Sequence, residues 1–254
     1  MQENLLSIRE VSKHFGGVYA VNRVNLDVRH EGICGLVGPN GSGKTTLFNT
    51  ILGIHKPDGG EIRFNNQCIN NLPPHQIYDL GLVNAFQIPR LFYSLSVLDN
   101  MLVAARDQQG DKLLNSLFRR RRWQEQEGGF IEKALDILKL VELEHLALAP
   151  AGELSGGQRK LLEFARGLMA EPKLLLLDEP AAGINPVLGK KIFQKIEESS
   201  HNGISFFIIE HRLEILFEFA SWVYVMNKGK IVIAGQPQSI IDDPAFYTIY
   251  LGEE

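Results

Sequence analysis

A glycine-rich loop between an apolar run and a helical run constrains the fold of this chain more than any other feature. Residues 38–45 read Gly-Pro-Asn-Gly-Ser-Gly-Lys-Thr, which fits the pattern G-x-x-x-x-G-K-[ST]. Glycines let successive backbone N–H groups point at phosphate oxygens, and the N-terminus of the following helix adds partial positive charge. With the apolar run 33–37 before it and the run 46–52 after it, the loop predicts an α/β fold that holds ATP or GTP. We expect Lys44 to neutralise the β- and γ-phosphates and Thr45 to supply a hydroxyl to Mg²⁺.

Three short runs are almost entirely apolar, at residues 33–37, 174–177 and 204–209, with Ser205 as the one polar residue. Such runs are typical of parallel strands that are buried on both faces. Alternating apolar residues nearer the N-terminus predict a mainly antiparallel sheet, and helical spacing between residues 87 and 153 predicts a helical insert. We therefore expect one domain over 1–254, in which a core with an antiparallel β subdomain (1–87 and 153–254) carries a helical subdomain (88–152).

The composition excludes several classes of protein. A formal net charge of -4 and a pI near 6.0 provide no basic field for holding nucleic acid. Cys34 and Cys68 cannot form a multi-disulfide framework, and they lack the close pairing of a zinc site. The N-terminus shows no secretion signal, and no apolar run reaches the roughly 18 to 20 residues that span a bilayer. The sequence thus indicates a cytoplasmic chain, and any membrane pore must come from other chains.

Two adjacent carboxylates, Asp178 and Glu179, follow the apolar run 174–177. Burying two neighbouring charges is costly unless something compensates them, and Mg²⁺ bound to ATP would do so. Asp178 is expected to bind the metal, and Glu179 to polarise an attacking water. An acidic helix cap after a strand is the plainer alternative, but it explains one carboxylate better than two.

Residues 154–158, Leu-Ser-Gly-Gly-Gln, come before a further helical run and resemble the signature of ABC transporter ATPases. Gln158 stands 20 residues before Asp178, a spacing like that of the family. By itself, Ser-Gly-Gly could be only a helix N-cap. The resemblance covers nearly the whole chain and implies the ABC ATPase fold, which is a P-loop NTPase (RecA-like) core with an antiparallel β subdomain and an inserted helical subdomain. It also implies that the signature faces the γ-phosphate of ATP held by a second subunit, in a head-to-tail homodimer or heterodimer.

The same resemblance implies roles for other residues. Phe15 is expected to stack on adenine with Val21 beside it, although by spacing alone a core position suits either residue equally well. Gln87 resembles the glutamine that senses Mg²⁺ and meets the membrane subunit, and His211 resembles the histidine that contacts the γ-phosphate. The catalytic residues expected are Lys44, Glu179 and His211; the Mg²⁺ ligands expected are Thr45, Gln87 and Asp178; the nucleotide contacts expected are Phe15, Val21, Gly38, Pro39, Asn40, Gly41, Ser42, Gly43, Lys44, Thr45, Thr46, Gln87, Ser155, Gly156, Gly157, Gln158 and Asp178.

The sequence departs from the family pattern at two places. Asn185 stands where an aspartate is usual in the stretch 181–186, and Arg212 follows His211 where an aspartate is frequent. Each replacement removes a negative charge near the expected dimer interface. A pairing that relied on either charge is therefore in doubt.

Four stretches are similar to the Liv-type ATPases, which energise importers of branched-chain and other hydrophobic or neutral amino acids: residues 86–92, the arginine-rich insert after residues 101–106, residues 181–186 and residues 250–254. This similarity implies two membrane permeases, a periplasmic or extracellular substrate-binding protein, a related ATPase and a place on the cytoplasmic face of the membrane. Lipopolysaccharide-export ATPases and urea or amide importers share much of the pattern.

Two further interpretations carry less weight. A non-transport ABC ATPase is disfavoured because the chain has no long coiled coil, no second ATPase domain and no strongly basic segment. A kinase or GTPase would not need residues 154–158. The run Arg119–Arg122 fits a solvated helix face or loop better than a contact with anionic lipid or a partner.

Overall fold

The computed structural model describes residues 4–85, 91–106 and 120–251 of the chain. The chain forms two compact units, one from residues 1–87 and 172–254 and the other from residues 88–171. We call these the core unit and the helical unit. The expected boundary at residue 152 differs from this division, because helix α6 (Gly156–Met169) packs on helices α3 (Val97–Val103) and α5 (Arg120–Leu140) of the helical unit.

A six-stranded sheet forms the centre of the core unit, and its strands follow the order β10-β9-β3-β8-β7-β6. All neighbours are parallel except β9 and β10, which form an antiparallel hairpin. The strands are β3 (Gly32–Val37), β6 (Leu82–Ala85), β7 (Leu174–Asp178), β8 (Ser205–Ile209), β9 (Trp222–Asn227) and β10 (Lys230–Gly235). The three apolar runs are β3, β7 and β8, and the prediction of buried parallel strands is confirmed. Their carboxyl ends therefore meet at one edge of the sheet, where open α/β sheets bind ligands.

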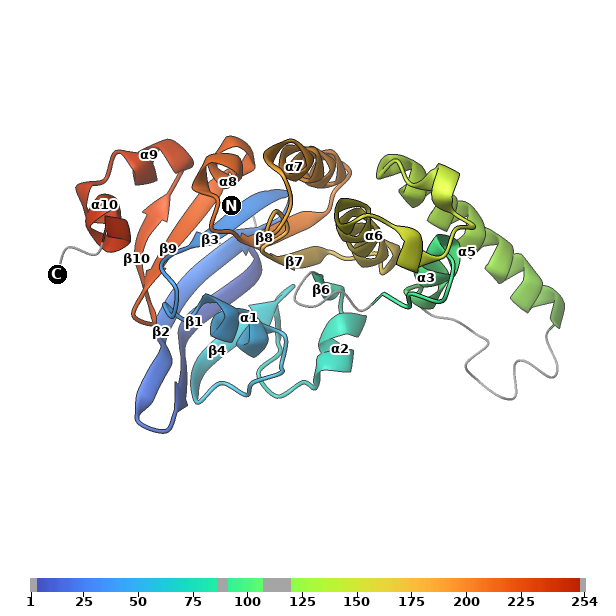
Figure 1. The fold of residues 1–254 in the computed structure, drawn as a ribbon. Helices are drawn as coiled ribbons and strands as arrows, with labels where there is room; N and C mark the ends of the chain where they lie inside the picture. The colour runs from blue at the N-terminus through green and yellow to red at the C-terminus, as the bar shows by residue number, and fades with distance from the viewer. Residues whose placement is uncertain (1–3, 86–90, 107–119, 252–254) are drawn as a thin grey trace. The chain divides into compact units, whose positions relative to one another are not determined.

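Helices cover both faces of this sheet, as Figure 1 shows. On one face, α1 (Lys44–Ile51) buries Leu47, Phe48 and Ile51, and the Phe48 ring lies 5.0 Å from that of Phe207 on β8. The other face carries α7 (Pro186–His201), α8 (Leu213–Phe219) and α9 (Pro237–Ile241), and α10 (Pro244–Leu251) packs against α8 and α9. The phosphate loop thus connects a central strand to a helix that is fixed by the core.

A four-stranded antiparallel sheet with the order β2-β1-β4-β5 completes the core unit. It consists of β1 (Asn4–Phe15), β2 (Val18–Arg29), β4 (Gly59–Phe64) and β5 (Gln67–Cys68), with helix α2 (Pro74–Asp79) following. Its inner face shares one apolar core with β3, β8 and α1. This confirms the antiparallel sheet that the alternating pattern predicts.

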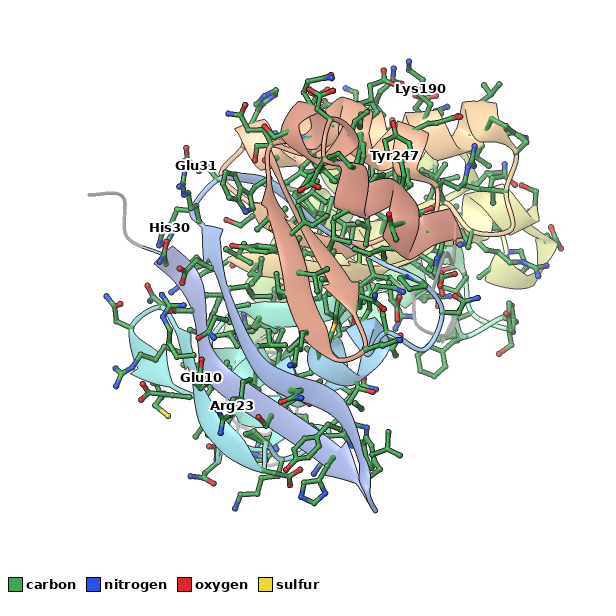
Figure 2. All side chains as sticks on the ribbon, turned by 90° about the vertical axis from the view of Figure 1, so that its left-hand side faces the viewer. Glu10, Arg23, His30, Glu31, Lys190 and Tyr247 are labelled. Carbon is green, nitrogen blue, oxygen red and sulfur yellow. The ribbon has the colours of Figure 1, made fainter. Side chains whose placement is uncertain are left out.

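Two β-bulges that offset each other bend the hairpin of β1 and β2. The pairing gains one residue in β1 between Ile8 and Val11, and then one in β2 between Val24 and Val21. At each bulge a residue takes a left-handed backbone, Glu10 with a φ of 51° and Arg23 with a φ of 50°. Figure 2 shows these two residues close together on the neighbouring strands.

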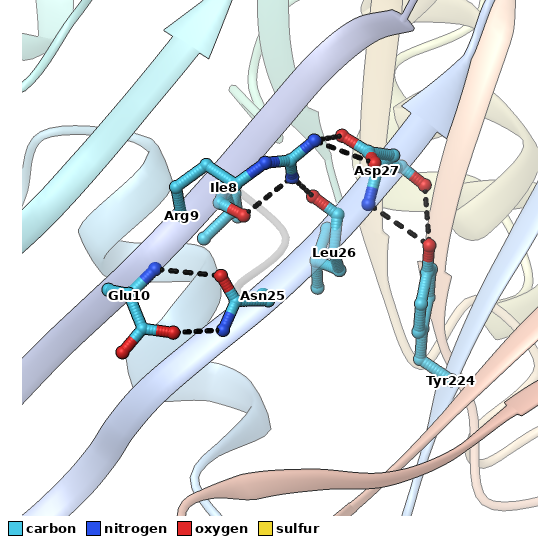
Figure 3. A network of polar contacts seen from close by, with 7 residues as sticks. All are labelled: Ile8, Arg9, Glu10, Asn25, Leu26, Asp27 and Tyr224. Atoms are coloured by element: carbon cyan, nitrogen blue, oxygen red, sulfur yellow. Dashed lines mark hydrogen bonds and ion pairs between the residues drawn. The ribbon is translucent and has the colours of Figure 1, made fainter.

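Side-chain hydrogen bonds hold the outer face of this hairpin (Figure 3). The Glu10 backbone N–H donates to Oδ1 of Asn25 at 3.0 Å, and the Asn25 amide donates back to the Glu10 carboxylate. Arg9 pairs with Asp27 at 2.8 Å. Tyr224 on β9 accepts from the Asp27 backbone N–H at 3.0 Å and donates to its carbonyl at 2.9 Å, so this one hydroxyl ties the two sheets together.

The helical unit is built around α3, α5 and α6, with short 3-10 turns at η2 (Glu144–Leu146) and η3 (Ala151–Glu153). Ala134, Leu138 and Val141 are fully buried, in agreement with the helical spacing of that segment. Gln87 lies outside the described residues, as does Arg119, and the side chains of 120–122 are not described either. Within the described ranges, no helix is both long enough and apolar enough to cross a membrane.

Candidate nucleotide site

Backbone atoms of other segments pack against the phosphate loop at two positions. This close packing explains why both positions are glycine. A Cβ at Gly38, where φ is 150°, would lie 2.0 Å from the Met226 carbonyl oxygen. A Cβ at Gly43, where φ is 106°, would lie 2.0 Å from the Ala20 carbonyl oxygen. No larger residue fits either position, because the obstructing atoms belong to backbone.

The phosphate loop carries a buried ammonium and a buried hydroxyl. Lys44 is only 6% exposed, and its Nζ donates to the carbonyl oxygens of Gly38 at 2.8 Å and Pro39 at 3.0 Å. The Ser42 hydroxyl is buried and has no hydrogen-bond partner in the described part of the chain. No side chain caps the N-terminus of α1. A buried ammonium, an orphaned hydroxyl and uncapped helix N–H groups together suit a polyphosphate.

Asp178 is the last residue of β7, and Glu179 follows it directly. Glu179 has a left-handed backbone, with a φ of 53°, and its N–H donates to the Ile209 carbonyl at 2.9 Å. Its Oε1 lies 3.0 Å from Nε2 of His211, while the Thr45 hydroxyl acts to lower the pKa of Asp178. Glu179 is therefore held directly against His211.

The charges of this cluster influence one another. Burial raises the pKa of Asp178, and the nearby Glu179 carboxylate raises it further, whereas Lys44, His211 and the Thr45 hydroxyl act against this. Burial lowers the pKa of Lys44, and Glu179 and Asp178 oppose that effect. A divalent cation would relieve the repulsion between the two carboxylates. The core unit thus brings together Lys44, Thr45, Asp178, Glu179 and His211.

The two residues expected at the adenine differ in exposure. Phe15, at the end of β1, is 48% exposed and meets His55 edge to face, with 5.2 Å between the ring centroids. The Lys13 ammonium lies over the same ring, with its Nζ 5.5 Å from the ring centroid. Val21 is fully buried. This agrees with the alternative that its spacing allowed, which is a position in the core.

The signature residues lie in the helical unit, where they begin α6. Ser155 is the N-cap, and its hydroxyl accepts from the Gln158 N–H at 3.3 Å. The Gln158 side chain accepts from the Ser155 N–H at 2.9 Å, which completes a capping box. The helix N-cap that Ser-Gly-Gly suggests by itself is therefore formed, and it fixes the backbone of Gly156 and Gly157.

The two departures from the family pattern have local explanations. Asn185 caps α7, because its Oδ1 accepts from the Leu188 N–H at 2.8 Å, and asparagine caps a helix as well as aspartate does. Nη1 of Arg212 lies 3.1 Å from the place that a Cβ on Gly189 would occupy. The absence of a side chain at Gly189 thus gives Arg212 room against α7.

Sequence analysis missed the C-terminal residues that support the loop. The Gly229 N–H donates to the Ser42 carbonyl at 2.9 Å, and the Gly229 carbonyl accepts from the Asn22 N–H at 2.8 Å. No motif marks Asn22 or Gly229, although the apolar run 223–226 is a signal for the strand that carries Met226.

Fold, site and sequence agree on one family. Residues 21–182 match the family model described as ABC transporter. The chain belongs to this family, as the resemblance of its motifs predicts, and its fold is that of the ABC ATPases.

The relatives make the class more specific. The chain is 41% identical to the probable branched-chain amino acid transport ATP-binding protein LivG of Archaeoglobus fulgidus, over 98% of this chain and 96% of the relative. It is 36% identical to the high-affinity LivG of Escherichia coli K12, over 100% of both chains. A crystal structure of an ATP-binding cassette of an ABC transporter in its ADP conformation matches with a TM-score of 0.86 and 39% identity, covering 98% of this chain and 99% of the other.

Proposed function

We propose that this chain is the ATP-binding and ATP-hydrolysing subunit of an ABC transporter that imports branched-chain or other neutral or hydrophobic amino acids. The cluster of Lys44, Asp178, Glu179 and His211 at the carboxyl edge of the central sheet supports ATP hydrolysis. The names of the relatives, which are branched-chain amino acid transport proteins, support the transport role.

In this proposal the chain's own residues position ATP and the attacking water. Lys44 exchanges its carbonyl contacts for the β- and γ-phosphates, and the N–H groups of residues 41–46 surround them. Glu179 orients the water. His211 holds the Glu179 carboxylate, and His211 also contacts the γ-phosphate. Thr45, Asp178 and Gln87 would hold Mg²⁺, which when bound neutralises phosphate charge.

The site is shared between two subunits in this proposal. The capping box aims the N-terminus of α6 outward with a fixed backbone, which suits the γ-phosphate of ATP on a partner ATPase. Two permease subunits bind the surface around Gln87 and the helical unit, on the cytoplasmic face of the membrane. A substrate-binding protein delivers the amino acid to those permeases.

Glu179→Gln tests the catalytic assignment. We expect steady-state ATP hydrolysis to fall by about 100-fold or more, because the glutamine cannot accept a proton. Binding of a labelled ATP analogue should persist. Glu218→Gln on α8 is the matched control, because Glu218 pairs with Lys190 at the surface. Turnover at the wild-type rate in Glu179→Gln would sink the assignment.

Uptake measurements test the transport role separately. Cells that lack this chain should lose ATP-dependent uptake of labelled leucine and regain it with the wild type, but not with Glu179→Gln. Co-purification with permease subunits should accompany the rescue. Normal leucine uptake without this chain would contradict the amino-acid assignment and leave the ATPase assignment standing.

A further inference from the structure

A hollow with a volume of about 790 Å³ lies in the core unit, away from the phosphate loop. Its lining includes residues 32–34, with which β3 begins, and Trp222, with which β9 begins. The phosphate loop follows Val37 and therefore lies at the other end of β3. Small-molecule pockets have volumes of about 300 to 1,000 Å³. The hollow is thus separate from the nucleotide site and large enough for a small organic molecule.

Hydrogen bonds to neighbouring elements fix the backbone that surrounds this hollow. The N–H of Glu31, labelled in Figure 2, donates to Oγ of Ser205 at 3.0 Å. The Gly32 N–H donates to Oγ of Ser200 at 3.0 Å. On another side, the Tyr224 hydroxyl joins β9 to β2 through two hydrogen bonds. The hollow is therefore already formed before a ligand enters it.

Two exposed side chains of opposite charge line the hollow, namely Arg29 and Glu31. Neither forms an ion pair with any residue that the structure describes, although they stand only two positions apart. Asp27 also lines the hollow, but its carboxylate pairs with Arg9 at 2.8 Å. One guanidinium and one carboxylate are therefore left for a molecule that carries both charges.

An aromatic ring lies beside the guanidinium. Cζ of Arg29 is 5.8 Å from the centroid of the Trp222 ring, a cation–π contact that holds the positive charge in place. Trp222 packs against the apolar core, and its ring meets that of Tyr224 edge to face, with 6.4 Å between the centroids. A molecule whose negative group pairs with Arg29 therefore has an apolar surface next to it.

We propose that this hollow binds a free α-amino acid with an apolar side chain. The carboxylate of the amino acid pairs with Arg29, its ammonium pairs with Glu31, and its side chain lies against Trp222. A zwitterion suits the site better than a simple anion or cation, because each of its charges gains an opposite partner. In the proposed transporter such amino acids are the imported molecules. That link rests on the proposed function, whereas the binding itself does not depend on it.

A series of three ligands tests the proposal on the purified full-length chain, with equilibrium dialysis or calorimetry as the measurement. L-leucine carries both charges, leucinamide lacks the carboxylate, and 4-methylpentanoate lacks the ammonium. We expect leucine to bind, and each of the other two to bind at least about tenfold more weakly. Absence of leucine binding at about 10 mM, or equal affinities for the three ligands, overturns the proposal.

Two charge-removing variants locate the binding. Arg29→Gln and Glu31→Gln should each raise the Kd of leucine by about tenfold, because each removes one charged partner. Arg29→Gln should leave the affinity for leucinamide unchanged, and Glu31→Gln should do the same for 4-methylpentanoate. Arg23→Gln is the matched control, because Arg23 is also an exposed arginine of β2 but does not line the hollow. If both variants bind leucine like the wild type, the hollow is not its site.

ATP hydrolysis separates this site from the proposed ATPase. Arg29→Gln and Glu31→Gln should hydrolyse ATP at the wild-type rate, since both residues lie away from the phosphate loop. If leucine fails to bind while Glu179→Gln loses hydrolysis, the amino-acid site is wrong and the ATPase assignment stands. If leucine binds as expected while Glu179→Gln hydrolyses ATP normally, the amino-acid site stands and the catalytic assignment fails.

Discussion

Glu163 is an acid placed inside the helical unit, on the buried side of α6. It is 6% exposed, and burial raises its pKa to about 7 despite the opposing charges of Lys160 and Arg166. The folded protein holds the Glu163 proton more tightly than the unfolded chain does. Protonation of Glu163 therefore stabilises the folded state, and this contribution is fully present below the ordinary pKa of 4.5. It is lost as the pH rises through about 7.

Glu163→Gln should remove this dependence on pH, because the amide resembles the protonated acid and cannot ionise. At pH 8 we expect the variant to be more stable than the wild type by about 1 to 3 kcal/mol, and near pH 4.5 to be equal to it. Urea unfolding at both pH values measures this, with the exposed Glu153→Gln as control. A stability difference that does not change with pH would contradict the assignment.

How far single residues are predictable depends on whether a motif contains them. The strand ends bring Lys44, Asp178, Glu179 and His211 together as the motifs suggest, while their catalytic roles stay predictions. Glu163 was not predictable, because what makes it unusual is its burial by segments remote in sequence. A lone glutamate in an amphipathic helix looks ordinary until the packing is known.

At the scale of elements, one buried amide organises the start of the helical unit. Asn100 on α3 is fully buried, and its Oδ1 accepts from the Phe92 N–H at 2.9 Å. Its Nδ2 donates to the Phe92 carbonyl at 3.0 Å and to the Ser96 carbonyl at 2.9 Å. The loop thereby exposes the rings of Phe92 and Tyr93, which lie against Arg166 and Arg159 of α6.

Asn100→Ala should destabilise the helical unit by about 2 to 4 kcal/mol, because it leaves backbone groups of the loop without partners. Ser96→Ala, which removes only the cap of α3, should cost about 1 kcal/mol. Hydrogen exchange of the Phe92 amide locates the effect, and this amide should exchange faster in Asn100→Ala than in Ser96→Ala. Equal stability losses in the two variants would show that the amide does not organise the loop.

Elements with strong patterns were predictable, and short or context-dependent ones were not. The runs 33–37, 174–177 and 204–209 agree with β3, β7 and β8 to within one residue at either end. The edge strand β6 has four residues and too little pattern to stand out. Nor does a periodic pattern reveal which unit a helix joins, so the grouping of α6 with α3 and α5 required the structure.

For the whole molecule, the important feature is that the phosphate loop and the signature belong to different compact units. In the proposed head-to-tail dimer, each ATP takes its loop from one chain and its signature from the other. A mixed dimer of two differently tagged copies can test this arrangement directly.

The amount of ATP bound per dimer should depend on whether Lys44→Ala and Ser155→Arg lie on the same chain or on different chains. With both changes on one chain, each shared site carries one change, and the dimer should retain almost no bound ATP. With one change on each chain so that they meet in the same site, about one ATP per dimer should remain, because the other site is intact. Bound labelled nucleotide per dimer is the measurement, and the reverse pattern would show that each signature serves its own chain.

The support of the phosphate loop by Met226 and Gly229 has a consequence for the order in which the protein matures. The motif at residues 38–45 is synthesised early, but β9 and the turn after it, which carry Met226 and Gly229, come from the last part of the chain. A nascent chain on the ribosome therefore contains the complete motif long before the residues that support the loop have been synthesised. Competence to hold nucleotide arises late in synthesis, so a stalled or truncated product would not compete with finished subunits for ATP.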